Sequence, residues 1–122
     1  MHAYLTKEFA RLARRSGLTD VGLFEALDRA EDGKIDANLG GGLIKQRVPL
    51  PGKGRSGGFR TVIAYRQGER AIFLHVFAKS RQENLNDIEL ETYRELAKTY
   101  LALDDQQLEA LVAVRGWRRI EK

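Results

Sequence analysis

The stretch FRTVIAYRQGERAIFLHVFA, residues 59–78, decides the class of fold that this sequence predicts. Two runs rich in β-branched and aromatic residues, 59–66 and 70–78, flank a short connection that contains a glycine. Such a pattern is typical of a β-hairpin. The run LIKQRV at residues 43–48 alternates in a similar way and ends before a proline, so we expect it to add a further antiparallel strand.

Helical patterns lie on both sides of this predicted sheet in the sequence. Apolar residues recur at helical spacing from Leu5 to Ala13 and again from Leu23 to Ala30. Residues that favour helix N-termini precede the second of these helices and two later ones: Thr19 or Asp20, Asn84 or Asn86, and Asp104 or Asp105. We therefore predict an α+β fold in a single domain, residues 1–122. Its small antiparallel sheet is expected to carry the helices on one face, with N-terminal helices packed on the sheet and C-terminal helices following it in the sequence.

The composition restricts the classes of function. With 43% hydrophobic and 31% charged residues, the chain of 122 residues is predicted to be soluble and to build one modest core. It has no apolar run long enough to span a membrane and no signal-like segment, so we expect a cytoplasmic protein without membrane contact. Because cysteine is absent and histidine occurs twice, we expect no metal, no cofactor and no histidine-based triad.

Positive charge is concentrated in one segment. Residues 37–68 contain six cations and no acid, whereas the rest of the chain holds fifteen cations and seventeen acids. Such a concentration is typical of a surface that binds a polyanion, and a solvated basic surface is the simpler alternative. Within the segment, PGKGRSGGFR at 51–60 mixes glycines with cations. It lacks the residue order of a P-loop, so a surface turn and a phosphate contact both remain open.

Strand alternation predicts where the cations of this segment point. Lys45 and Arg47 are two residues apart and therefore share one face of their strand. Arg60 lies at the start of the next strand, and Lys79 directly follows the last one. If these strands are neighbours, Lys45, Arg47, Arg60 and Lys79 converge on one surface.

The last of these strands, 70–78, is predicted to alternate without interruption. One face would be a core face with Ile72, Leu74 and Val76, and the other would carry Phe73, His75 and Phe77. For His75 we expect a partly buried position in the sheet rather than a catalytic one, because no acid or nucleophile is arranged near it in the sequence.

Taken in order, the runs NLGGGLIKQRV, PGKGRSGGFRTVIAYR and IFLHVFAKSRQENL resemble the RelE/HigB-like toxins of bacterial type II toxin–antitoxin systems, in the RelE/ParE superfamily. The resemblance covers residues 36–103 and extends to the N-terminal helices by their layout. It implies the RelE-like fold and a metal-independent endoribonuclease that cleaves translated mRNA in the ribosomal A site. It also implies a cognate antitoxin with a helix-turn-helix DNA-binding domain.

The resemblance also assigns roles to individual residues. The implied catalytic residues are Lys45, Arg47, Arg60 and Lys79, with Arg81 beside them as an RNA-binding residue. The glycine-rich loop itself predicts that Lys53 and Arg55 bind RNA, because a flexible backbone lets these cations follow the phosphates. Arginine forks suit phosphate oxygens, a lysine crowded by cations could act as the base, and a second lysine could protonate the leaving oxygen. The family pattern has a tyrosine after the last strand, where this chain has Gln82, Glu83 and Asn84. Its next tyrosine, Tyr93, falls within a predicted helix, which leaves the general base open.

Two alternatives to the nuclease remain at this stage. ParE-like toxins use the same fold to bind DNA gyrase and are not nucleases. A non-catalytic module could hold RNA or the ribosome with the same basic residues and perform no chemistry. The clustering of cations on the predicted strands favours the nuclease.

Overall fold

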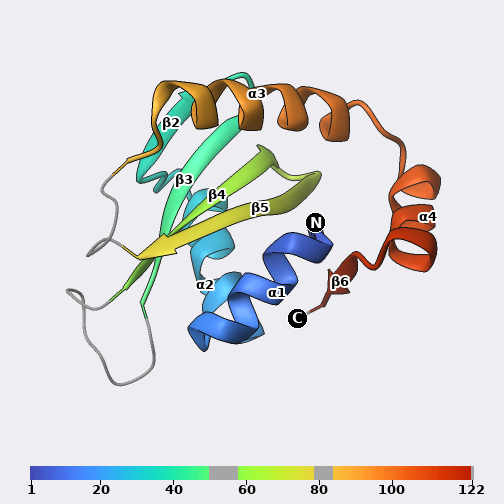
Figure 1. Ribbon diagram of the computed structural model, residues 1–122, viewed down its shortest axis with the longest axis horizontal. Helices are drawn as coiled ribbons and strands as arrows, with labels where there is room; N and C mark the ends of the chain where they lie inside the picture. The colour runs from blue at the N-terminus through green and yellow to red at the C-terminus, as the bar shows by residue number, and fades with distance from the viewer. Residues whose placement is uncertain (50–57, 79–83, 122) are drawn as a thin grey trace.

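The structure is a computed structural model, and it describes residues 1–49, 58–78 and 84–121. These residues form one mixed sheet with helices packed against it (Figure 1). The strands are β1 (His2–Leu5), β2 (Ala37–Gly40), β3 (Leu43–Val48), β4 (Phe59–Arg66), β5 (Arg70–Ala78) and β6 (Arg118–Ile120). The helices are α1 (Lys7–Ser16), α2 (Asp20–Glu31), α3 (Asp87–Leu101) and α4 (Asp105–Arg115). The predicted α+β class is confirmed.

The sheet has the strand order β2-β3-β4-β5-β1-β6. Strands β3, β4 and β5 form the predicted antiparallel meander, and β2 joins β3 at one edge. The first element is a correction, because the stripe predicted to be helical from Leu5 begins as strand β1, which pairs in parallel with β5. Helix α1 starts two residues later, where the Thr6 hydroxyl accepts the Phe9 amide as an N-cap. A strand of four residues is too short to show an alternation in the sequence.

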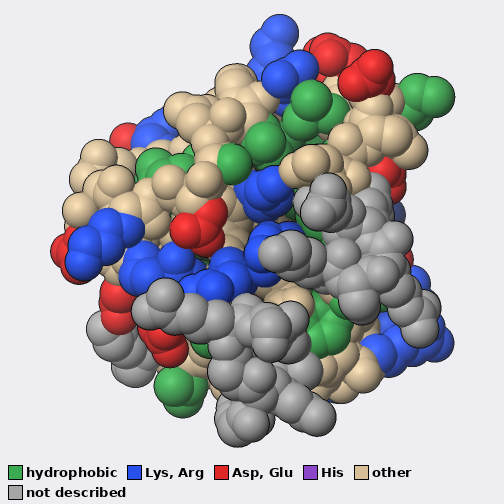
Figure 2. All heavy atoms as spheres, turned by 90° about the vertical axis from the view of Figure 1, so that its left-hand side faces the viewer, with side chains coloured by type: hydrophobic (Ala, Val, Ile, Leu, Met, Phe, Trp, Pro, Cys, Tyr) green, Lys and Arg blue, Asp and Glu red, His purple; other side chains and the backbone are tan. Residues whose placement is uncertain are grey.

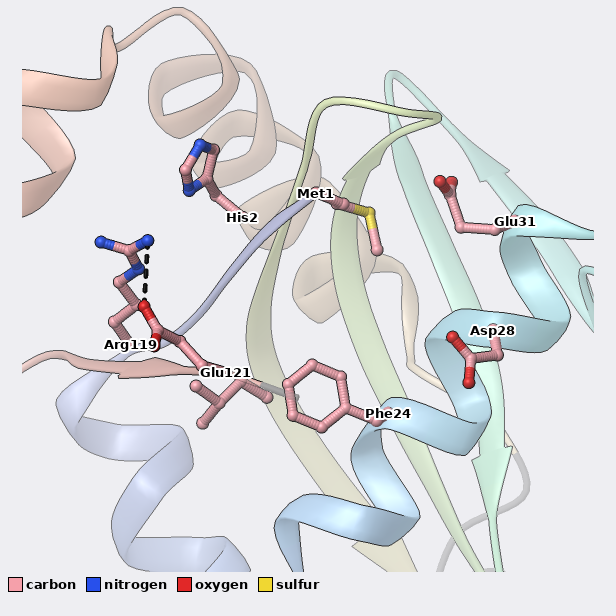
Figure 3. Close-up of a pocket in the computed structure, with 8 residues that line it drawn as sticks. Met1, His2, Phe24, Asp28, Glu31, Arg119 and Glu121 are labelled. Atoms are coloured by element: carbon pink, nitrogen blue, oxygen red, sulfur yellow. Dashed lines mark ion pairs between the residues drawn. The ribbon is translucent and has the colours of Figure 1, made fainter.

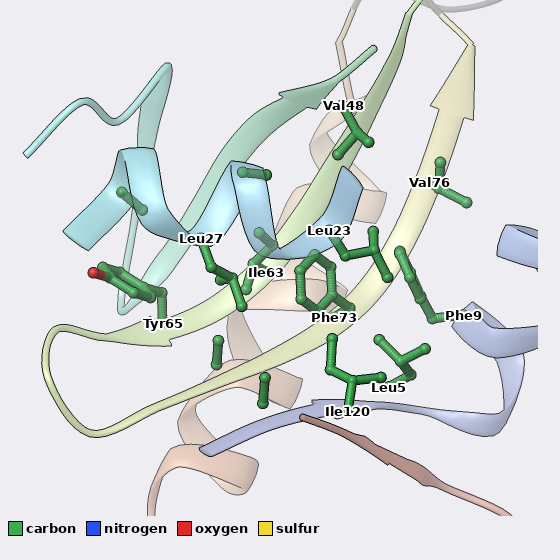
Figure 4. Packing of buried hydrophobic residues seen from close by; sticks show 14 of the residues in the cluster. Leu5, Phe9, Leu23, Leu27, Val48, Ile63, Tyr65, Phe73, Val76 and Ile120 are labelled. Carbon is green, nitrogen blue, oxygen red and sulfur yellow. The ribbon is translucent and has the colours of Figure 1, made fainter. Parts of the chain in front are cut away.

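Helices cover both faces of the sheet, so the prediction that helices pack on one face is wrong. One hydrophobic cluster lies between the sheet and helices α1 and α2, with Phe9, Leu27, Ile63 and Phe73 among its members (Figure 4). A second cluster joins the opposite face to residues of α3 and α4. The physical reason is that β4 carries consecutive apolar residues on both faces, so each face requires a cover.

A β-bulge in β5 changes the face on which its last residues lie. Val62 of β4 pairs with His75, but the next residue, Ile63, pairs with Phe73, so Leu74 is an extra residue. The predicted uninterrupted alternation of this strand is therefore wrong. Phe73 packs in the cluster under α1 and α2, whereas Phe77 packs in the cluster on the opposite face.

The helix N-termini follow the predicted capping chemistry. Thr19 caps α2, while Asn86 and Asp104 cap α3 and α4 through complete capping boxes. In the part of the chain that the structure describes, no helix has both the length and the apolar character that crossing a membrane requires.

Candidate nucleic-acid site

Three of the predicted site residues lie on one face of the sheet. Between β3 and β4, Arg47 pairs directly with Arg60, and Lys45 pairs with Val62 two residues further along the sheet. Directly paired residues of antiparallel strands project to the same side, so the three cations form one row, here called the cation row. Each of the three side chains is partly buried. Figure 2 shows lysine and arginine side chains gathered on the side of the molecule where these strands end.

Some of the predicted cations cannot be located in this arrangement. Lys79, Lys53, Arg55 and Arg81 lie outside the described residues. The convergence of Lys45, Arg47 and Arg60 is therefore observed, and the place of the other four remains a prediction.

Arg60 is held in an environment that leaves part of its guanidinium unsatisfied. Its Nη1 atom is buried and has no hydrogen-bond partner among the described residues. A buried donor without a partner costs about 1–3 kcal/mol. Arg47 lies directly opposite, and like charges in that position also destabilise a sheet. An anion bound between the two guanidinium groups would relieve both costs.

On the outer edge of β3, away from β4, the backbone of Arg47 is held by side chains rather than by a neighbouring strand. Strand β2 pairs with β3 as far as Lys45, so the outer edge of β3 is unpaired beyond that residue. There the Arg47 amide donates to Asp36 Oδ2 at 2.6 Å, and Arg29 Nη2 donates to the Arg47 carbonyl. Arg29 and Asp36 are themselves an ion pair, with 3.3 Å between nitrogen and oxygen. This network positions Arg47 within the cation row.

Gln46 anchors the opposite face of the same strand. Its side chain is fully buried, and it donates to the carbonyls of Ala26 at 2.9 Å and Lys34 at 3.3 Å. Its Oε1 accepts the amide of Asp36 at 2.6 Å. Because strand residues alternate, this buried amide fixes Lys45 and Arg47 on the opposite side, toward the cation row.

Lys45 joins the cation row to the segment before α3. Its Nζ donates to Asn84 Oδ1 at 2.6 Å. Of the two asparagines considered as caps of this helix, Asn86 is the cap and Asn84 contacts β3 instead.

The bulge brings two aromatic residues beside the cation row. His75 lies level with Lys45 and Val62, and its ring stacks on Tyr93 of α3 with centroids 5.2 Å apart and planes at 21°. Burial lowers the pKa of His75 from 6.5, while nearby Glu89 and Glu8 oppose that shift. Burial also raises the pKa of Tyr93. At neutral pH the pair is therefore an uncharged imidazole on a protonated phenol.

The sequence predicts neither member of this pair as a site residue. Uninterrupted alternation of the strand places His75 on the face of Phe73, and Tyr93 falls within a helix rather than directly after the strand. The available signal was the apolar stripe of α3, since Tyr93, Ala97 and Leu101 recur at intervals of four residues and pack in or against the same cluster.

An α+β domain with a row of partly buried cations on one face of its sheet, one of them with an unsatisfied donor, has the charge distribution typical of a surface that binds a polyanion. The model of the family described as "RelE toxin of RelE / RelB toxin-antitoxin system" matches residues 1–119, nearly the whole chain. The chain therefore belongs to this family and is a RelE-type toxin of a toxin–antitoxin system. An antitoxin is thus implied as a partner, and toxins of this family are generally endoribonucleases. A comparison with curated proteins found no match.

Proposed function

We propose that this toxin is a ribosome-dependent endonuclease that cleaves translated mRNA in the A site and so inhibits translation. Family membership supports a toxin, and the cation row supports a phosphodiester as the group on which it acts. The observation that carries the proposal is the buried Nη1 of Arg60, which lacks a partner among the described residues, in a residue that pairs directly with Arg47 across the two strands.

The chemistry follows from charge. The ribose 2′-OH attacks the adjacent phosphorus, the bond from phosphorus to the 5′-oxygen breaks, and a 2′,3′-cyclic phosphate and a 5′-OH remain. The transition state carries more negative charge on the phosphate oxygens than the substrate does. Arg47 and Arg60 stabilise that charge with planar forks, and removing one such donor typically costs roughly 10²–10³ in rate. The need for a 2′-OH restricts the reaction to RNA.

Two side chains of the site are candidates for accepting the 2′-OH proton. Lys45 is the candidate from the sequence, and it lies in the cation row. His75 is the candidate from the structure, because its lowered pKa keeps the imidazole neutral and ready to accept a proton at neutral pH. Lys79 remains our candidate for protonating the leaving 5′-oxygen. Tyr93, which keeps its proton, can support the imidazole or stack on a base.

A translating extract tests this proposal. Purified toxin should cut mRNA at codon-spaced positions while ribosomes translate, and Arg60→Ala should abolish the cuts. Arg66→Ala is the matched control, because Arg66 lies exposed at the other end of β4. Gyrase-trapped DNA breaks without mRNA cuts would replace the nuclease by a gyrase poison, and bound but intact RNA would replace it by a non-catalytic module.

The partner assignments extend the same proposal. The toxin would contact mRNA and ribosomal RNA of the A site in the cytoplasm, without a cofactor. Its antitoxin would carry a helix-turn-helix DNA-binding domain. Co-expression with the gene that neighbours it tests this point, because an antitoxin should restore growth and copurify with the toxin.

A further inference from the structure

A groove runs between helix α2 and strand β6, away from the cation row. It consists of two adjoining hollows of about 370 and 330 Å³. Both are lined by Phe24, Asp28 and Glu121, so they form one continuous depression. Figure 3 shows the ring of Phe24 extending from α2 toward the β6 segment.

The groove has an apolar floor and exposed apolar residues beside it. Phe24 and Ile120 belong to the groove and also pack in or against the hydrophobic cluster beneath it. Beside them Val21 is 78% exposed in the first turns of α2, and Met1 is 49% exposed. An apolar strip of this kind, bordered by charged residues, is typical of a surface that binds another polypeptide.

The rim of the groove is acidic although the protein as a whole has a net charge of +4. The acids that line it are Asp20, Glu25, Asp28, Glu31 and Glu121. Arg119 also lines it, but its guanidinium is already paired with Glu121 at 3.0 Å (Figure 3). It is also paired with Glu109 at 3.0 Å. Asp20 is likewise paired with Arg118 at 2.8 Å, so the net negative charge of the groove comes from Glu25, Asp28 and Glu31 of α2.

The groove and the cation row lie on opposite faces of the sheet. The groove residues Phe24 and Ile120 pack with the cluster under α1 and α2. Arg60 alternates with Thr61 and pairs with Phe77, which packs in the cluster on the α3 side. An acidic surface repels RNA, so the occupant of the groove is of another class.

We propose that this groove binds a basic, amphipathic helical segment of a partner polypeptide. Apolar side chains of the segment would cover Val21 and Phe24, and its lysines and arginines would face the acids of the rim. The rim acids contributed by α2 extend from Asp20 to Glu31, about 16 Å along the helix axis, which matches about three turns of a partner helix. A segment bound there leaves the cation row uncovered.

The test uses a synthetic peptide and the full chain labelled with ¹⁵N. The probe is a capped helical peptide of four turns with leucine on one face and lysine and arginine elsewhere. A matched peptide carries glutamate at every basic position. The basic peptide should shift amide resonances of α2 and β6, and the acidic peptide should shift none of them. Raising the salt concentration from 50 to 300 mM should weaken binding about tenfold.

Two variants and a control decide the location. Val21→Lys and Glu25→Lys should each weaken binding of the basic peptide about tenfold, since both residues are exposed and neither supports the core. Glu95→Lys, an equivalent exposed acid on α3, should leave the affinity unchanged. The proposal is overturned if the basic peptide shifts no α2 or β6 resonance, if both peptides bind equally, or if Glu95→Lys has the same effect. These measurements do not depend on RNA cleavage.

Discussion

Replacing Arg60 by Met should make the protein more stable and less active. Methionine keeps an unbranched apolar side chain and removes both the buried Nη1 without a partner and the charge opposite Arg47. The unsatisfied donor costs about 1–3 kcal/mol, and an opposed like-charge pair costs about 0.2–1 kcal/mol. Because Arg60 is partly exposed to water, we take the lower end, a gain of about 1 kcal/mol. At about 2.1 cal/mol/K per residue, this raises Tm by about 4 °C.

The assay measures both quantities on the same preparation. Thermal unfolding gives Tm in the absence of RNA, and cleavage in a translating extract gives the rate, which should fall roughly 10²–10³-fold. Arg66→Met serves as the control, since its exposed ion pair with Glu69, at 3.8 Å, contributes about 0–1 kcal/mol. A lower Tm for Arg60→Met, with activity lost in proportion to unfolding, would show that Arg60 supports the fold and would refute the reasoning.

Three further results follow from the site. Asp36→Ala removes the acceptor of the Arg47 amide, so it should lower the free energy of unfolding by about 1–3 kcal/mol. It should also slow cleavage about tenfold at a temperature where the variant is folded. Asp32→Ala is the control, and equal losses in both variants would contradict the positioning role of Asp36. Ribosome affinity should fall about 20-fold between 50 and 200 mM salt if the three cations of the row each contact a phosphate, and about sevenfold in Arg60→Met, as filter binding would measure. The pKa of His75 in the folded protein lies below 6.5, so on acidification the unfolded chain binds this proton before the folded protein does. The contribution of His75 to the free energy of unfolding is therefore fully present above pH 6.5 and is lost as the pH falls through the folded pKa. Urea titrations at several pH values should show that the free energy of unfolding falls less on acidification in His75→Phe than in the unaltered protein. The same dependence of this free energy on pH in both proteins would count against a buried neutral imidazole.

The sequence predicted the elements whose own residues determine them. The face of β3 could be predicted because Lys45 and Arg47 alternate with the buried residues Ile44, Gln46 and Val48 at a strict period of two. The caps of α2, α3 and α4 could be predicted because the side chain that satisfies the helix is local. The grouping of Arg60 with these two cations depends on the register of β3 on β4, because residues 61–65 of β4 are all buried and show no alternation that would assign Arg60 to a face.

Elements that depend on distant partners could not be predicted in this way. Strands β1 and β6 are short, and each becomes a strand because a neighbour supplies its hydrogen bonds. Helices on both faces were foreseeable in part, since Val62, Ile63 and Ala64 are consecutive apolar residues in one strand, a pattern typical of a strand buried on both sides. The network of Arg29, Asp36 and Arg47 joins residues that carry no shared pattern in the sequence.

The bulge in β5 is the feature that the sequence concealed and that bears most on the site. Without it, His75 would lie on the same face as Phe73, under α1 and α2, because strict alternation places residues i and i+2 together. With Leu74 as an extra residue, His75 lies level with Lys45 and stacks on Tyr93. The bulge, the opposed arginines and the unsatisfied Nη1 of Arg60 thus occur on one face, within neighbouring register positions. Each weakens the sheet, and a sheet selected for stability alone would lack all of them. Departures from local folding rules are expected to occur together at functional sites, so these three features support our proposal that RNA is cleaved at this end of the sheet rather than in the acidic groove.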